Sequence, residues 1–192
     1  MAPVRSIADA LWSFWSRGKR TERSAYVVGA LLIVSGLIHL ILLVVTGASW
    51  KGPLSLRKAS TFGLSFGLTL ITITWVASFL DLSARGRAIV LGAFTVASVM
   101  ETALVSLQVW RGVPSHFNLE TTFDAWIARV LAGGGMVLVA LIVVLTVAAF
   151  RMNPSLPISL LVAIRVGFAT LVGAVVVGGT DDCQRNAAGV SR

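Results

Sequence analysis

Five long runs of apolar residues, separated by short polar links, organise this chain. They lie at about 26–47, 61–80, 88–110, 130–150 and 157–179. As an α-helix rising about 1.5 Å per residue, a run of about 20 residues crosses a hydrocarbon core of about 30 Å. The pattern therefore predicts an all-α fold, a multi-pass transmembrane helical bundle of about five spans.

The segments outside the spans are short and polar, and none has the length of a soluble domain. Residues 1–25 are predicted to be a cytoplasmic N-terminal segment, either an interfacial helix in the headgroup layer or a partly ordered tail. Residues 26–179 form the predicted transmembrane domain, and 180–192 a polar tail. The links carry turn formers such as Gly112 and Pro114, which is typical of antiparallel neighbours in a bundle.

The amino-acid composition agrees with a membrane protein, and it affects how the net charge of the chain is interpreted. Of the 192 residues, 56% are hydrophobic and 12% charged, whereas an average soluble domain has about 25% charged residues. That excludes an ordinary water-soluble globule. The net charge of +8 would indicate a nucleic-acid partner in a soluble chain, but here it indicates membrane topology. We expect the lipid bilayer, and a homo-oligomer or other membrane subunits, as partners, and no nucleic acid.

The basic residues that precede the first span set the predicted orientation. There are five of them: Arg5, Arg17, Lys19, Arg20 and Arg23. Positive charge beside a first span favours the cytoplasmic side, where anionic lipid also attracts it. We therefore predict residence in the cell (cytoplasmic) membrane, with the N-terminus in the cytoplasm and the C-terminus outside. Three tryptophans then lie at the outer interface: Trp50, Trp110 and Trp126.

Three ionisable side chains fall inside predicted spans: His39, Glu101 and Arg165. A charged group at the centre of a span costs at least about 2.5 kcal/mol on insertion scales, so each needs a physical reason to be there. His39 and Glu101 both lie about 12 to 13 Å below the outer interface, and Thr69 reaches the same layer. The spacing therefore predicts one polar layer contributed by three helices.

Neighbouring polar residues at helical spacing extend this layer. Glu101 and Gln108 share one face of the third span. Two further shared faces are Ser35, His39 and Thr46 on the first span, and Thr61, Ser65, Thr69 and Thr72 on the second. The candidate intramembrane site comprises His39, Thr69, Glu101, Gln108 and Arg165.

Two interpretations of that site differ in their chemistry. In the first, the cluster faces inward, and Glu101 and His39 exchange a proton or hold a cation or polar ligand. In the second, Glu101 only hydrogen-bonds a neighbouring hydroxyl, while Ser and Thr side chains bond to their own helix backbone. Arg165 has a similar pair of interpretations, because it either pairs with Glu101 or extends toward the cytoplasmic headgroups.

Glycines cluster in two of the spans. Gly63 and Gly67 form a small-xxx-small pair, which close helix packing explains. The triplet at 133–135 has two interpretations, because broken transporter helices also carry such runs. We favour packing for the triplet, since Arg129 is the only polar side chain near it.

The link after the third span is the most informative stretch outside the spans. Its candidate site residues are Arg111, Ser115, His116, Asn118 and Asp124. In a functional interpretation, basic residues of the two outer links form a rim around His116 that receives an anionic headgroup or solute. The alternative is a Gly-Pro turn into a helix that Thr121 or Thr122 caps, with Asp124 in its first turn.

The run from Glu101 to Asp124 also carries a resemblance. It holds the loop sequence RGVPSHFN at 111–118, followed by Thr121. With the lysine-led start of the second span at Lys58, and Trp75 beyond it, the chain resembles a family of bacterial multi-pass integral membrane proteins of unknown function. The resemblance covers about residues 26–178 and implies family membership without any particular activity.

Similar proteins continue past this length with a further polar loop and more spans. The resemblance therefore implies a C-terminal truncation, with the chain departing from the family pattern after Gly179. The alternative is a genuine short protein whose tail is disordered.

These observations define the expected class of function. No nucleophile, metal or nucleotide motif stands out, and the only two histidines, expected at different depths, predict no metal or cofactor. We therefore expect binding or translocation of a small solute or a proton through the polar intramembrane site. The alternatives are a structural or assembly subunit without chemistry and, third, a membrane-embedded enzyme that modifies lipid.

Overall fold

The computed structural model describes residues 16, 18–52, 55–116, 118–151 and 156–187, with side chains up to residue 174. Within that part of the chain, it contains five α-helices and no strand. They are α2 (Arg20–Val45), α3 (Leu56–Ala77), α4 (Ala84–Trp110), α5 (Thr122–Phe150) and α6 (Ile158–Ala187). The predicted all-α fold is confirmed.

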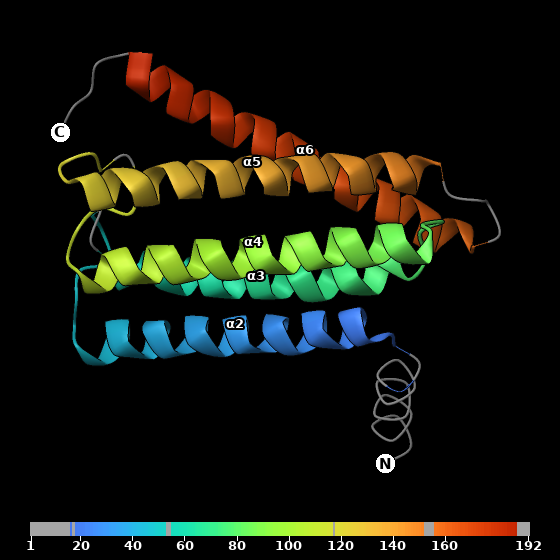
Figure 1. The fold of residues 1–192 in the computed structure, drawn as a ribbon, viewed down its shortest axis with the longest axis horizontal. Helices are drawn as coiled ribbons and strands as arrows, with labels where there is room; N and C mark the ends of the chain where they lie inside the picture. The colour runs from blue at the N-terminus through green and yellow to red at the C-terminus, as the bar shows by residue number, and fades with distance from the viewer. Residues whose placement is uncertain (1–15, 17, 53–54, 117, 152–155, 188–192) are drawn as a thin grey trace.

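Consecutive helices run in opposite directions (Figure 1). Helix α2 contacts both α3 and α4, α3 contacts α4, α4 contacts α5, and α5 contacts α6. Helix α6 crosses α5 at a slant and diverges from the other helices toward its C-terminal end (Figure 1). We call the end with the α2–α3 and α4–α5 loops the distal end, and the end where α2 begins the proximal end.

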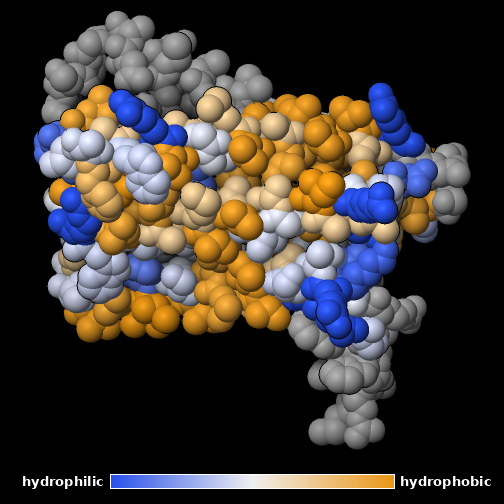
Figure 2. All heavy atoms as spheres, viewed as in Figure 1, coloured by the Kyte–Doolittle hydropathy of each residue, from blue (hydrophilic) through white to orange (hydrophobic). Residues whose placement is uncertain are grey.

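The surface of the bundle has the pattern of a membrane protein. In the described residues, four helices, α2 to α5, are long and apolar enough to cross a membrane, and the part of α6 from Ile158 to Ala174 is apolar but shorter. Hydrophobic atoms form a band across the middle of the molecule, with hydrophilic atoms gathered at both ends (Figure 2). The chain is therefore a multi-pass helical membrane protein.

Besides α2, which begins at Arg20 rather than near 26, three helices begin earlier than the apolar runs predict. These three begin at Leu56, Ala84 and Thr122 rather than near 61, 88 and 130. Each is capped by a hydroxyl that accepts a hydrogen bond from a backbone N–H of the first turn. The hydroxyl of Ser55 accepts from the N–H of Arg57 at 3.2 Å. The hydroxyl of Ser83 accepts from Gly86, and that of Thr121 from Asp124, both at 3.1 Å. The first turns of these helices are polar, so a prediction from apolar runs alone places the helix starts too late.

Two predicted segments at the ends of the chain fall partly outside the described residues. Most of the predicted interfacial helix in 1–25 lies there, since residues 1–15 and 17 are not described. Helix α2 itself begins at Arg20, within that segment. In the predicted polar tail, residues 180–187 continue α6.

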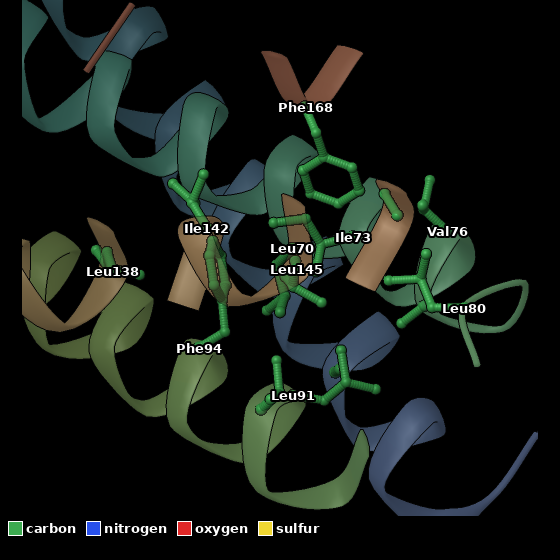
Figure 3. Close-up of a cluster of buried hydrophobic side chains, with 14 of the residues drawn as sticks. Leu70, Ile73, Val76, Leu80, Leu91, Phe94, Leu138, Ile142, Leu145 and Phe168 are labelled. Carbon is green, nitrogen blue, oxygen red and sulfur yellow. The ribbon is translucent and has the colours of Figure 1, made fainter. Parts of the chain in front are cut away.

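Two apolar clusters of buried residues lie in the interior. The larger, proximal cluster joins all five helices, α2 to α6, with Leu70, Phe94, Leu145 and Phe168 among its buried members (Figure 3). The smaller, distal cluster consists of Val105, Ile127 and Leu131, with Phe62 and Leu104 packed against it. On α4, Glu101 lies between the two clusters.

Helices α2 and α3 pack backbone against backbone. A Cβ atom added at Gly63 would lie 2.7 Å from the backbone nitrogen of Gly36, and one at Gly67 would lie 2.6 Å from the carbonyl oxygen of Gly29. Real Cβ atoms do not approach neighbouring atoms this closely, so these positions admit only glycine without a shift. The prediction that Gly63 and Gly67 serve close helix packing is confirmed.

Candidate functional site

Helix α4 presents Glu101 to α5 in the interior of the bundle. The side chain is 4% exposed. On α5 it meets Gly134, where an added Cβ atom would lie 2.5 Å from Oε1 of Glu101. Helix α5 runs through 133–135 without a break, so Gly134 makes room for a carboxyl group within a continuous helix.

The carboxyl oxygen Oε1 of Glu101 is buried and has no hydrogen-bond partner among the described residues. The hydroxyl oxygens of Ser98, Thr102 and Ser106, on the same helix, are buried without a partner in the same part of the chain. Most buried polar groups in native proteins are hydrogen-bonded, and an unpaired one is costly in an apolar surrounding. This stretch of α4 is therefore where the interior departs most from a packed apolar core.

Two grooves meet at Glu101, one on each side of the α4–α5 contact. The first, of about 440 Å³, runs between α4 and α5, with Met100 and Val137 in its walls. The second, of about 530 Å³, is lined by α3, α5 and the α4–α5 loop, and we call it the α3–α5 groove. Glu101 and Leu131 line both. The carboxyl group therefore borders space on two sides.

His39 is buried on α2 and is bonded through both ring nitrogens. Its Nδ1 lies 2.8 Å from the carbonyl oxygen of Ser35, and Nε2 accepts a hydrogen bond from Nε1 of Trp110 at 3.0 Å. With a donor at Nε2, the proton of the neutral imidazole lies on Nδ1 and is donated to Ser35. His39 thus joins α2 to the end of α4. The predicted exchange partner Glu101 shares no hydrogen bond with it in the described part of the chain.

Thr69 lines neither of the two grooves at Glu101. Together with Thr72 it lines an apolar groove of about 450 Å³ between α3 and α6. The prediction that the hydroxyl face of α3 points into the bundle is wrong, because Thr61, Ser65 and Thr72 are exposed. Thr72 donates to the carbonyl oxygen of Leu68 on its own helix. The glycine contact with α2 fixes the rotation of α3 and turns these hydroxyls outward.

Arg165 binds the end of α5 rather than Glu101. Its Nε donates to the carbonyl oxygen of Ala149 and an Nη to that of Phe150, both at 3.3 Å. The guanidinium lies 5.6 Å from the centre of the Phe150 ring. Of the two interpretations of Arg165, the pairing with Glu101 is wrong, because the guanidinium is bonded near the proximal end. There the last carbonyls of α5 attract a cation.

Asp124 is the centre of a buried polar cluster at the distal end, which we call the Asp124 lock. Its carboxylate accepts hydrogen bonds from Gln108 Nε2 at 3.0 Å, from Thr121 Oγ1 at 2.7 Å and from Arg111. Arg111 also donates to Gln108 Oε1 and lies 4.8 Å from the ring centre of Phe123. The lock joins the end of α4 to the start of α5.

The lock brings together residues from both predicted sites. Gln108 was expected in the intramembrane site, and Arg111 and Asp124 in the outer-loop site. Glu101 and Gln108 are both buried on α4, as their shared face predicts. The alternative interpretation of this loop is confirmed in its details, since Thr121 caps α5 and Asp124 stands in its first turn.

The remaining loop residues are held against α3. Ser115 is buried, with Oγ 3.0 Å from Nδ1 of His116, and the His116 ring lies 5.9 Å from the ring of Phe62. Asn118 Oδ1 accepts from the backbone N–H of Glu120 at 3.1 Å. His116 lines the α3–α5 groove, whose opposite part reaches Glu101. The structure therefore places His116 and Glu101 in one groove.

Sequence reasoning missed Gly134 as the neighbour of Glu101 and Arg129 as a lining residue of the α3–α5 groove. A signal for the first exists in the chain. Glu101 lies nine residues before the end of α4, and Gly134 twelve residues after the start of α5. In an antiparallel pair joined by a short loop, residues at similar distances from that loop face each other.

No family model, curated protein or solved structure matches the chain. The resemblance carried by RGVPSHFN therefore stays a prediction. Within the described residues, no group of three His, Cys, Asp or Glu side chains comes together as a metal site requires.

Proposed function

We propose that this protein binds a proton, or a small solute that carries one, at Glu101 and moves it through the membrane. One observation carries the proposal: a buried carboxyl group stands between two grooves in a bundle of membrane-spanning length, and one of its oxygens has no partner among the described residues. Ionisable groups in such surroundings are rare and mark ion, proton or substrate paths.

Ionisation of Glu101 in the interior of the bundle costs free energy. A carboxylate buried among apolar side chains is unstable unless a proton or a cation neutralises it. No basic side chain pairs with Glu101 in the described residues, since the ion pairs there join Arg87 to Glu22 and Arg111 to Asp124. A mobile proton or a cationic solute is therefore the natural partner of this group.

The surroundings also allow the proton to arrive and leave. Grooves on both sides of the α4–α5 contact give the carboxyl group two directions of access. Ser98 and Thr102 supply buried hydroxyls near Glu101 on the same helix. Gly134 has no side chain at the place where Oε1 of Glu101 lies, which leaves room for the carboxyl group to change rotamer.

Infrared difference spectroscopy of the purified chain tests proton binding without knowledge of the cargo. A buried carboxylic acid gives a C=O stretching band that disappears when the group ionises. We expect that band to titrate in the wild-type protein and in the Glu120→Gln variant, whose changed side chain is exposed in the α4–α5 loop. We expect the band to be lost in Glu101→Gln.

Transport is measured on the same three proteins in vesicles that enclose a pH-sensitive dye. Proton uptake along an imposed pH gradient should fall in Glu101→Gln and persist in Glu120→Gln. If Glu101→Gln keeps both the infrared band and the uptake of the wild type, the proposal is wrong. A structural role for the chain would then be the better conclusion.

A further inference from the structure

The α3–α5 groove has the dimensions of a binding site for a lipid chain. Its walls are mainly apolar, with Phe62 and Phe66 on α3 and Leu131 and Leu138 on α5. Along α5 it extends from Ala128 to Leu138, about 15 Å at the helical rise per residue. That is about half of a hydrocarbon core of about 30 Å, the depth of one leaflet.

The groove opens sideways, toward the surroundings of the bundle. Three of its lining residues are exposed: Leu119, Arg129 and Ala132. On its floor, Gly135 has no atom within 4 Å of the place where a Cβ would lie. A chain entering from the membrane therefore meets no side chain at this point of α5.

The distal part of the groove carries positive charge. Arg129 lines it there, about 8 Å along α5 from Gly134 and hence from the level of Glu101. No acidic side chain of the described residues pairs with Arg129. His116 lines the same part of the groove. A guanidinium beside an apolar channel of one-leaflet depth matches a phosphate attached to an acyl chain.

We propose that the α3–α5 groove binds one anionic phospholipid from the leaflet at the distal end. Its phosphate contacts Arg129 beside His116, and one acyl chain lies against Phe62 and Phe66. The acyl chain then lies in the groove beside Glu101, whose Oε1 is buried without a partner in the part of the chain that the structure describes. This lipid site goes beyond the proposed function, because it requires no proton transfer at Glu101.

Lipid titration of the purified full chain in detergent tests the headgroup contact. Phosphatidylglycerol or phosphatidylcholine with the same acyl chains is added, and bound lipid is counted by native mass spectrometry. We expect one phosphatidylglycerol to bind in preference to phosphatidylcholine. Arg129→Gln should weaken that binding about tenfold, the usual size of one charge-assisted contact. The matched control is Arg151→Gln, since Arg151 is exposed at the proximal end.

A pair of glycine variants tests the groove itself. Gly133 and Gly135 both have open space at the Cβ position, but only Gly135 lines the α3–α5 groove. Gly135→Leu places a side chain in the groove and should abolish binding of the single phosphatidylglycerol. Gly133→Leu should bind it as the wild type does. Equal thermal unfolding of the two variants in detergent establishes that both are folded.

Three results would overturn the proposal. They are equal binding of the two lipids by the wild type, equal loss in Arg129→Gln and Arg151→Gln, or undiminished binding in Gly135→Leu. Glu101→Gln separates this proposal from the proposed function. That variant should keep the bound phosphatidylglycerol while losing the infrared band of the carboxylic acid.

Discussion

Two helix pairs in this bundle meet through glycine and use it differently. At the α2–α3 contact, the atoms that face Gly63 are backbone atoms of Leu32 and Gly36 on α2, within 2.8 Å of an added Cβ. At the α4–α5 contact, the atom that faces Gly134 is the carboxyl oxygen of Glu101. The backbone of α2 fills the space beside Gly63, whereas the end of a flexible side chain fills the space beside Gly134.

This difference separates packing from candidate chemistry. The α2–α3 contact gains dispersion energy from closely packed backbones. The α4–α5 contact holds a buried acid between two grooves, and Oε1 of that acid has no hydrogen-bond partner in the described part of the chain. A small residue in a membrane helix therefore has no fixed meaning. What the facing helix places against it decides whether the position serves packing or binding.

The largest expected effect is on the packed contact. Gly63→Ala forces its Cβ against the backbone of α2, which cannot move aside without shifting the helix. We expect the free energy of unfolding, measured by denaturant titration in detergent micelles, to fall by about 3 kcal/mol, the upper part of the range for overpacking. Gly92→Ala, where no atom lies within 4 Å of the added Cβ, is the control.

The control should move in the opposite direction. Alanine is a better helix former than glycine by about 1 kcal/mol, so Gly92→Ala should be neutral or stabilising. If Gly63→Ala is tolerated as well as Gly92→Ala, the α2–α3 contact is not the rigid one that we describe.

The next effect concerns what holds α5 against α4 at the distal end. Asp124→Ala removes the acceptor of Gln108, Thr121 and Arg111 and leaves the buried Nε2 group of Gln108 without its acceptor. We expect a loss of about 2 kcal/mol in the free energy of unfolding, as for hydrogen bonds to a charged group. Glu120→Ala in the same loop, an exposed side chain, should change it by less than about 0.5 kcal/mol. Similar losses in the two variants would show that the lock does not hold the pair together.

Sequence alone was sufficient for the features set by local spacing. The apolar runs predict the five helices, the spacing of Glu101 and Gln108 predicts their common buried face, and Thr121 with Asp124 predicts a helix start. Each of these depends on the helix period or on residues within one turn of each other. No knowledge of the neighbouring helix is required.

The sequence alone could not predict the features that depend on how neighbouring helices are rotated and aligned. His39 and its donor Trp110 are 71 positions apart in the chain, and the outward turn of Thr69 follows from the glycine contact with α2. Spacing left two interpretations of Arg165, pairing with Glu101 or extension toward the cytoplasmic headgroups. Carbonyl groups at the end of α5 are the nearer partners. Depth along a span is readable from sequence, whereas direction around a helix depends on which faces pack.

The smallest effect on stability is expected at Gly134, in the α4–α5 contact. This variant tests directly whether the two glycine contacts differ. Gly134→Ala places a Cβ 2.5 Å from Oε1 of Glu101. Because that atom ends a flexible side chain, the carboxyl group should change rotamer and the bundle should stay intact. We expect the free energy of unfolding to change by less than about 1 kcal/mol, and the infrared band of the Glu101 carboxylic acid to shift.

Gly133→Ala and Gly135→Ala are matched controls for this variant, since no atom lies within 4 Å of the added Cβ at either position. Both should leave the band in place. If Gly134→Ala instead destabilises the protein as much as Gly63→Ala, the carboxyl group is held as rigidly as a helix backbone. The two contacts would then be of one kind, and an acid fixed in that way could not carry a proton between the two grooves.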